Sequence, residues 1–150
     1  MFFNQTQARA IVGISAETLR HWKKVIPDFS VKSGHSAKFE LGDMLALKII
    51  KNLTDSCAIK VGSLSTISKD VIYLCNNTDW FELERLNLLV DLDEDCCETA
   101  PVFEQKTFSN ISIIIPLAKF INELYEQLNE MKGMNVVQGS LLAGNNGGQG

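Results

Sequence analysis

The apolar positions near the start of the chain predict two short helices joined by a tight turn. A first helix is expected over residues 5–12, because polar cap-forming residues precede its apolar positions and Gly13 follows them. A second helix is expected over residues 16–26, with Ser15 as its N-cap. Its inward positions are apolar and recur at helical spacing: Ala16, Leu19, Trp22 and Ile26. Only two or three residues separate the helices, which is typical of a helix-turn-helix.

The opposite face of the second helix is polar and carries positive charge. Glu17, Arg20, His21 and Lys24 share this face. Hydrogen-bond donors and cations on an exposed helix suit contacts to phosphates and base edges in a DNA major groove. A solvated amphipathic helix without a ligand is the alternative interpretation.

The pattern changes to strand-like segments after Pro27 and returns to helical spacing at residue 42. Residues 29–31 and 38–41 are expected to form a hairpin, and the basic, glycine-containing run 32–36 would be its tip. Such a hairpin would be a wing beside the helix-turn-helix, or an ordinary surface hairpin. Further helices are expected over residues 42–54 and 61–74.

This order of elements, together with several motifs, resembles the DNA-binding domain of the MerR family of transcriptional regulators. The matching motifs are Gly13-Ile14-Ser15, Thr18-Leu19-Arg20-His21-Trp22, Lys38-Phe39, and Asp43-Met44-Leu45-Ala46-Leu47 followed by Ile50 and Leu53. They cover about half of the chain. The wing departs from the family pattern, because Ser36 and Ala37 stand where the family usually carries arginine, and no long antiparallel dimerisation helix is expected beyond Cys75.

The resemblance implies a winged helix-turn-helix that binds double-stranded DNA. The residues expected to contact DNA lie on the first two helices and the wing: Thr6, Ser15, Glu17, Thr18, Arg20, His21, Lys23, Lys24, Lys32, Ser33, His35 and Lys38.

The second half of the chain predicts a small unit of strands and one helix. Two or three strands are indicated by three features: an imperfect alternation over residues 81–92, apolar residues around a polar turn at 102–108, and the β-branched run 111–115. Pro116 fits the first turn of a helix that would end at Gly133. Its apolar stripe is wide and is expected to form a homodimer interface, or else to pack within the monomer: Leu117, Phe120, Ile121, Leu124, Leu128 and Met131.

The expected fold class is therefore α+β. We divide the chain into a winged helix-turn-helix over residues 1–75, an acidic dimerisation or effector region over 76–132, and a flexible Gly/Asn-rich tail over 133–150.

The net charge of −4 hides an asymmetry between the two halves. Residues 1–75 carry ten Lys or Arg and six Asp or Glu, a balance of +4, whereas residues 76–150 carry four and twelve, a balance of −8. A basic half can bind a polyanion that the acidic half would repel. The overall acidity therefore does not exclude DNA binding.

Other residue patterns argue against a catalytic or metal-dependent function. The four cysteines form no CxxC pair and have no histidine at metal-ligand spacing, so we expect neither a disulfide framework nor a metal or cofactor. The acidic run 91–95 should keep Cys96 and Cys97 as thiols. No nucleophile–base pair or phosphate-binding loop is present, and we expect no enzyme activity. The sequence contains no signal peptide or membrane span, which predicts a cytoplasmic protein.

These features favour a transcriptional regulator that binds specific DNA sequences. We expect it to bind as a homodimer, because one short recognition helix covers too few base pairs for sequence specificity. One alternative is a phage or mobile-element architectural DNA-binding protein, such as an excisionase-like or packaging factor. Another is a protein-binding adaptor that uses the acidic run. The sequence does not indicate an operator or a small-molecule effector.

Overall fold

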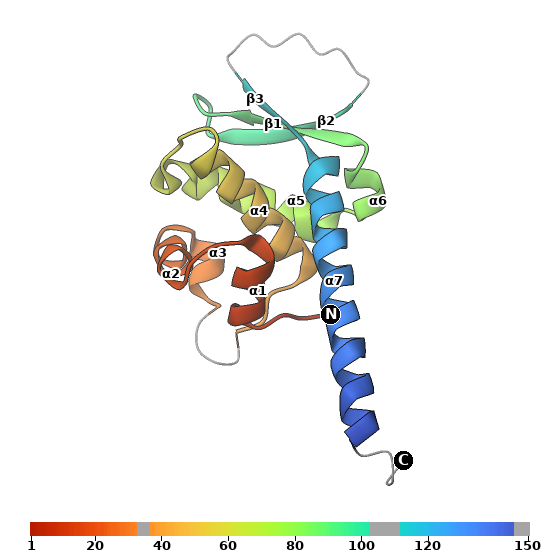
Figure 1. Cartoon of the computed structure of the whole chain (residues 1–150). Helices are drawn as coiled ribbons and strands as arrows, with labels where there is room; N and C mark the ends of the chain where they lie inside the picture. Colours follow the sequence, from red (N-terminus) through yellow and green to blue (C-terminus); the bar gives the residue numbers. More distant parts are fainter. Residues whose placement is uncertain (33–36, 103–111, 146–150) are drawn as a thin grey trace.

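The computed structural model has an α+β fold, as predicted, and describes residues 1–32, 37–102 and 112–145. The helices of the first half are α1 (Gln5–Val12), α2 (Ala16–Val25), α3 (Pro27–Ser30), α4 (Leu41–Asp55), the 3₁₀ helix η1 (Val61–Leu64) and α5 (Ser65–Asn77). The second half contains α6 (Trp80–Leu83), β1 (Leu86–Asp91), β2 (Cys96–Pro101), β3 (Ser112–Pro116) and α7 (Leu117–Asn145). Helix α4 runs through the middle of the molecule, with α1–α3 at one end, the sheet at the other, and α7 alongside (Figure 1).

The first two helices have the caps that the sequence predicts. Asn4 and Gln7 form a reciprocal capping box at the start of α1, with side chain to backbone distances of 2.8 and 2.9 Å. Gly13 ends α1 in the left-handed conformation, with φ of 80°, which favours glycine. The Ser15 side chain accepts a hydrogen bond from the Thr18 N–H at 3.1 Å and caps α2. The two predicted helices and the short turn between them are therefore present, with the caps that the sequence indicates.

The predicted wing hairpin is wrong in the described residues. The segment that was expected to form its first strand lies in α3 and the turn that follows, because Pro27 occupies the first turn of α3 and Phe29 is completely buried. Phe39 forms an isolated β-bridge with Phe3 instead, through two N–H···O bonds of 2.8 Å. The expected tip, including Ser33 and His35, lies in residues 33–36, outside the described residues.

Helix α4 supplies the centre of the core, as its predicted apolar stripe indicates. Its buried positions include Met44, Leu45, Leu47, Ile49 and Ile50, each at most 1% exposed. The predicted helix over 61–74 is present as η1 followed by α5. One hydrophobic cluster joins side chains of the first half to those of β1, β3 and α7.

Gly42 allows α4 and α5 to approach each other closely. A Cβ added at Gly42 would collide with the Asn76 side chain and would lie 2.6 Å from the carbonyl oxygen of Cys75. At Gly133, within α7, an added Cβ would meet no described atom within 4 Å, and its φ is not positive.

These two glycines are expected to respond in opposite directions to alanine. Gly42→Ala should lower the free energy of unfolding by about 1–3 kcal/mol, because the added methyl group overpacks a close helix contact. Gly133→Ala should raise it by about 0.5–1 kcal/mol, because alanine favours a helix interior. Urea denaturation followed by circular dichroism measures both. If Gly133 instead ended the helix with a positive φ, its alanine variant would be destabilised.

The second half forms a three-stranded antiparallel sheet with strand order β2-β1-β3. Leu88 in β1 faces Thr99 in β2 and Ile115 in β3 in the pairing register. The alternating pattern expected over residues 81–92 is divided between α6 and β1. Pro116 ends β3, and α7 begins one residue later than predicted. Residues Phe103 and Phe108 of the predicted turn lie outside the described residues.

The structure corrects two expectations about α7. The helix continues through Gly133 to Asn145, so Gly133 does not end it. It packs against α1, α4, α6 and β1, which buries Leu117, Phe120, Ile121 and Leu124 of its apolar stripe and leaves Leu128 and Met131 half-buried. Leu117, Ile121 and Leu124 are completely buried there and are therefore not available as a dimer interface.

Within the described residues, no helix combines the length and apolar character that a membrane span requires.

Candidate nucleic-acid interface

Helix α2 presents a polar face to solvent and packs its apolar face into the core. Glu17, Arg20, His21 and Lys24 are all exposed, as predicted. Leu19 is completely buried and Trp22 is 4% exposed, which confirms their expected place in the core. Three other predicted DNA-contact residues also reach solvent. Thr6 of α1 and Ser15, the N-cap of α2, are exposed, and Thr18 of α2 is half-buried. The face can therefore contact a ligand without any change in the packing of the helix.

A hollow on one flank of α2 carries carboxylates. It has a volume of about 390 Å³ and is lined by Glu17, His21 and Trp22 of α2 and by Asp55 at the end of α4, among others. Two acidic side chains on this flank would repel phosphate. Arg20 and Lys24 do not line this hollow, so they are the α2 side chains better placed to contact a DNA backbone.

Lys23 belongs to the junction between α1, α2 and the segment at Phe39. Its ammonium group donates a hydrogen bond to the Gln5 side chain at 2.7 Å and lies 5.9 Å from the centre of the Phe39 ring. Burial lowers the pKa of Lys23. Lys23 thus contributes a contact between α1 and α2 in addition to any contact with DNA.

Two of the predicted wing cations, Lys32 and Lys38, lie among the described residues. They differ in whether the ammonium group is paired with a carboxylate. Lys32 forms an ion pair with Asp43 at 3.0 Å and donates to the Lys38 carbonyl oxygen at 2.8 Å. Lys38 is exposed, and its ammonium group lies 5.4 Å from the centre of the Phe2 ring. The structure therefore leaves Lys38 more available to phosphate than Lys32.

Asp43 organises this region, a role that its position in the sequence does not by itself reveal. It is 3% exposed and accepts hydrogen bonds from the Glu40 N–H at 2.9 Å and the Asn76 side-chain amide at 3.0 Å. Together with the Lys32 ion pair, these bonds link the segment before α4 to α5. The spacing between Glu40 and Asp43, which form a capping box, was the signal that could have indicated part of this role.

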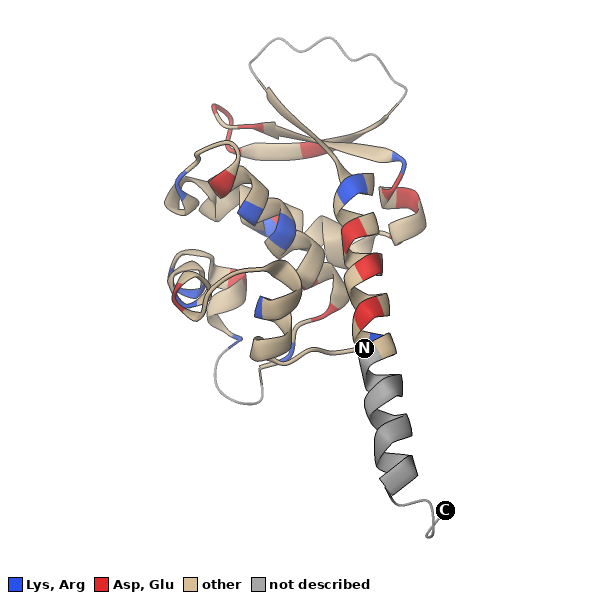
Figure 2. Cartoon of the chain, viewed as in Figure 1, with Lys and Arg blue, Asp and Glu red and all other residues tan. Residues whose placement is uncertain are grey.

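The charge asymmetry of the sequence is also an asymmetry in space. Figure 2 shows lysine and arginine on α1, α2 and α4 and beside the segment 33–36, with a few acidic residues on α2 and α3. Acidic residues follow one another along α7, after a cation in its first turn, and occupy the turn between β1 and β2. On α7 these are Glu123, Glu126 and Glu130. A polyanion would therefore be attracted to the end of the molecule that contains α1–α3.

The four cysteines are free, and Cys96 and Cys97 favour the thiol form, in agreement with the prediction for the acidic run. Cys57 and Cys97 are half-buried, Cys75 is buried and Cys96 is exposed. Burial, followed by the charges of Asp70 and Cys96, raises the pKa of Cys97 to about 12. Desolvation and the nearby carboxylates, with Asp91 the largest contributor among them, raise the pKa of Cys96. Both changes keep thiolate, the reactive form, scarce at neutral pH.

The chain was compared with models of known protein families and with curated proteins, and neither comparison gives a match.

Proposed function

We propose that this protein is a regulator of transcription that binds specific sequences of double-stranded DNA as a homodimer. The observation that carries the proposal is the helix-turn-helix itself: α2 is capped, follows α1 through a short turn at Gly13, and exposes Arg20, His21 and Lys24 together. A helix held in this way by a buried opposite face can enter a major groove, with donors and cations directed toward base edges and phosphates.

The electrostatics of the molecule support the same face as the DNA-binding surface. Cations lie on and near α2, while the acidic residues of α7 and of the β1–β2 turn lie on other elements (Figure 2). Lys38, beside the Phe3–Phe39 bridge, supplies a further cation close to this region. We assign Arg20 and Lys24 the principal contacts, with Lys38 contacting the DNA backbone.

The homodimer is part of the proposal because one short helix reads only a few base pairs. Two copies related by a two-fold axis would place two recognition helices in successive major grooves, about 34–36 Å apart. The stripe at Leu117, Ile121 and Leu124 is excluded as the interface by its burial in the monomer. Specificity would therefore depend on a different contact between the two chains.

Selection of binding sites from random double-stranded DNA by the full chain tests this proposal. We expect a recurrent motif made of two inverted half-sites whose centres are about 10 base pairs apart, and two chains per site in sedimentation. A motif without symmetry, bound by one chain, would contradict the homodimer. Binding without any preferred sequence would contradict the regulator and favour an architectural protein, and no binding at low salt would contradict both.

A further inference from the structure

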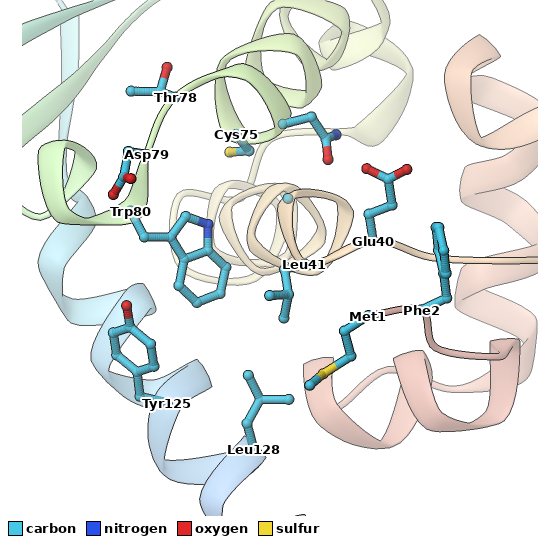
Figure 3. A pocket seen from close by; sticks show the side chains of 12 residues that line it. Met1, Phe2, Glu40, Leu41, Cys75, Thr78, Asp79, Trp80, Tyr125 and Leu128 are labelled. Atoms are coloured by element: carbon cyan, nitrogen blue, oxygen red, sulfur yellow. The ribbon is translucent and has the colours of Figure 1, made fainter.

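A second concave surface lies away from the exposed face of α2, where the two halves of the chain meet. It is a groove of about 630 Å³ between the N-terminal segment, the start of α4, the end of α5, α6 and α7 (Figure 3). This volume is within the range of about 300–1,000 Å³ that is typical of small-molecule sites. None of the functions proposed above uses this groove.

The groove has an aromatic and aliphatic surface that is open to solvent. Trp80 of α6 and Tyr125 of α7 pack edge to face, with ring centres 5.3 Å apart. Leu41 and Leu128 lie beside them and are only half-buried (Figure 3). Tyr125 is 44% exposed, and Phe2 at the other end is 58% exposed. Apolar side chains gathered in a concave, solvent-open surface indicate that a ligand covers them.

Two carboxylates lie at opposite ends of this apolar surface. Asp79 is next to Trp80, whereas Glu40 lies beyond Leu41 and near Phe2 (Figure 3). Both are exposed, and neither forms an ion pair with a described residue. Asp79 uses one carboxylate oxygen, Oδ1, to accept the Phe81 N–H at 2.8 Å. No lysine or arginine lines the groove among the described residues, although the Lys38 ammonium group lies 5.4 Å from the centre of the Phe2 ring at the Glu40 end.

This arrangement defines the chemistry of a ligand. A positive group at each end would meet a carboxylate, and a hydrocarbon chain between them would cover Leu41 and the face of Trp80. An ammonium group beside Trp80 and Tyr125 would also be attracted to their rings. An anion would be repelled by both carboxylates, and a neutral ligand would gain no ionic attraction from either of them. We propose that the groove binds a linear aliphatic diamine in its doubly protonated form.

An NMR titration of the full chain with a series of diamines tests the proposal without any DNA, so its outcome is independent of the proposed DNA binding. The probes are the α,ω-diaminoalkanes from propane-1,3-diamine to octane-1,8-diamine. Hexylamine and hexane-1,6-diol are the matched ligands with one charge and none. The chain contains two tryptophans, and Trp22 is buried, so the indole N–H signal of Trp80 reports on the groove and that of Trp22 is an internal control.

We expect saturable shifts of the Trp80 signal, an affinity maximum at one chain length, and weaker binding of hexylamine and hexane-1,6-diol. Glu40→Gln and Asp79→Asn remove one charge each and keep their hydrogen-bonding shape, and asparagine is a good N-cap for α6. Each should weaken the binding of the best diamine about two- to fivefold, the value for an exposed ion pair, and the double variant about four- to 25-fold. The control variant Glu82→Gln/Glu126→Gln changes the net charge equally at two positions that do not line the groove, and should bind like the wild type.

Three results would overturn the proposal. The first is the absence of a Trp80 shift with every diamine at millimolar concentration. The second is equal affinity for hexylamine and for the best diamine, which would mean that only one carboxylate takes part. The third is an equal loss of affinity in the Glu40/Asp79 double variant and in the control variant, which would mean that the diamine responds to net charge alone.

Discussion

Leu124→Glu is expected to unfold the whole protein. Leu124 is completely buried in the hydrophobic cluster that also contains the central residues of α4. A carboxylate at this position would have to lose its hydration without gaining a partner, and such changes cost more than about 4 kcal/mol. Because total stabilities are about 5–15 kcal/mol, this loss removes most or all of the margin. Both halves share the cluster, so the unfolding should include α1–α5.

Circular dichroism and urea denaturation measure this effect, with Asn122→Glu as the matched control. Asn122 is an exposed position on the same helix, so its variant introduces the same charge without burial and should keep the wild-type denaturation midpoint. A folded Leu124→Glu variant with an unchanged midpoint would contradict the position of α7 in the core. A folded variant that changes only from dimer to monomer would restore the stripe as a dimer interface.

The sequence predicted the elements whose signals are local. Asn4, Gly13 and Ser15 determine where α1 and α2 begin and end, because caps and a left-handed glycine act within a few residues. The exposed face of α2 followed from the same reasoning, since its apolar and polar positions alternate with helical spacing. The candidate DNA-binding residues on α2 could therefore be predicted with their correct exposure.

The predictions that failed depended on contacts between distant residues. Phe29 belongs to a short helix although aromatic and β-branched residues around it favour a strand, because its burial against the core outweighs that preference. The pairing of Phe39 with Phe3, and of Lys32 with Asp43, joins segments whose proximity no local pattern encodes. Likewise, the stripe at Leu124 indicates that the helix is covered on one side, but periodicity does not distinguish this chain's own core from a second copy.

Loss of DNA affinity on changing Arg20 and Lys24 is the other large effect that we expect. Both side chains are exposed on α2, and neither lines the adjoining hollow that Glu17 and Asp55 line. A side chain that contacts a base should contribute about 1–3 kcal/mol, so that alanine weakens binding and relaxes preference at one position. A side chain that contacts only phosphate should weaken all sequences alike and reduce the salt dependence by about one unit.

Lys69→Ala is the matched control for this measurement. Lys69 is exposed on α5, the helix that packs against β2 of the sheet, and it does not belong to α2. Its variant removes the same charge from the chain as Lys24→Ala. Any difference between the two therefore reports on position and not on net charge.

The measurement that tests the proposed DNA binding most directly is an anisotropy titration of the selected DNA site with four proteins at several salt concentrations. These are the wild type, Arg20→Ala, Lys24→Ala and Lys69→Ala. We expect both α2 variants to bind more weakly than the wild type at fixed salt, while Lys69→Ala binds like the wild type. Each α2 variant should also either relax the sequence preference at one position or reduce the salt dependence by about one unit. Wild-type affinity for both α2 variants would contradict the assignment of α2 as the recognition helix.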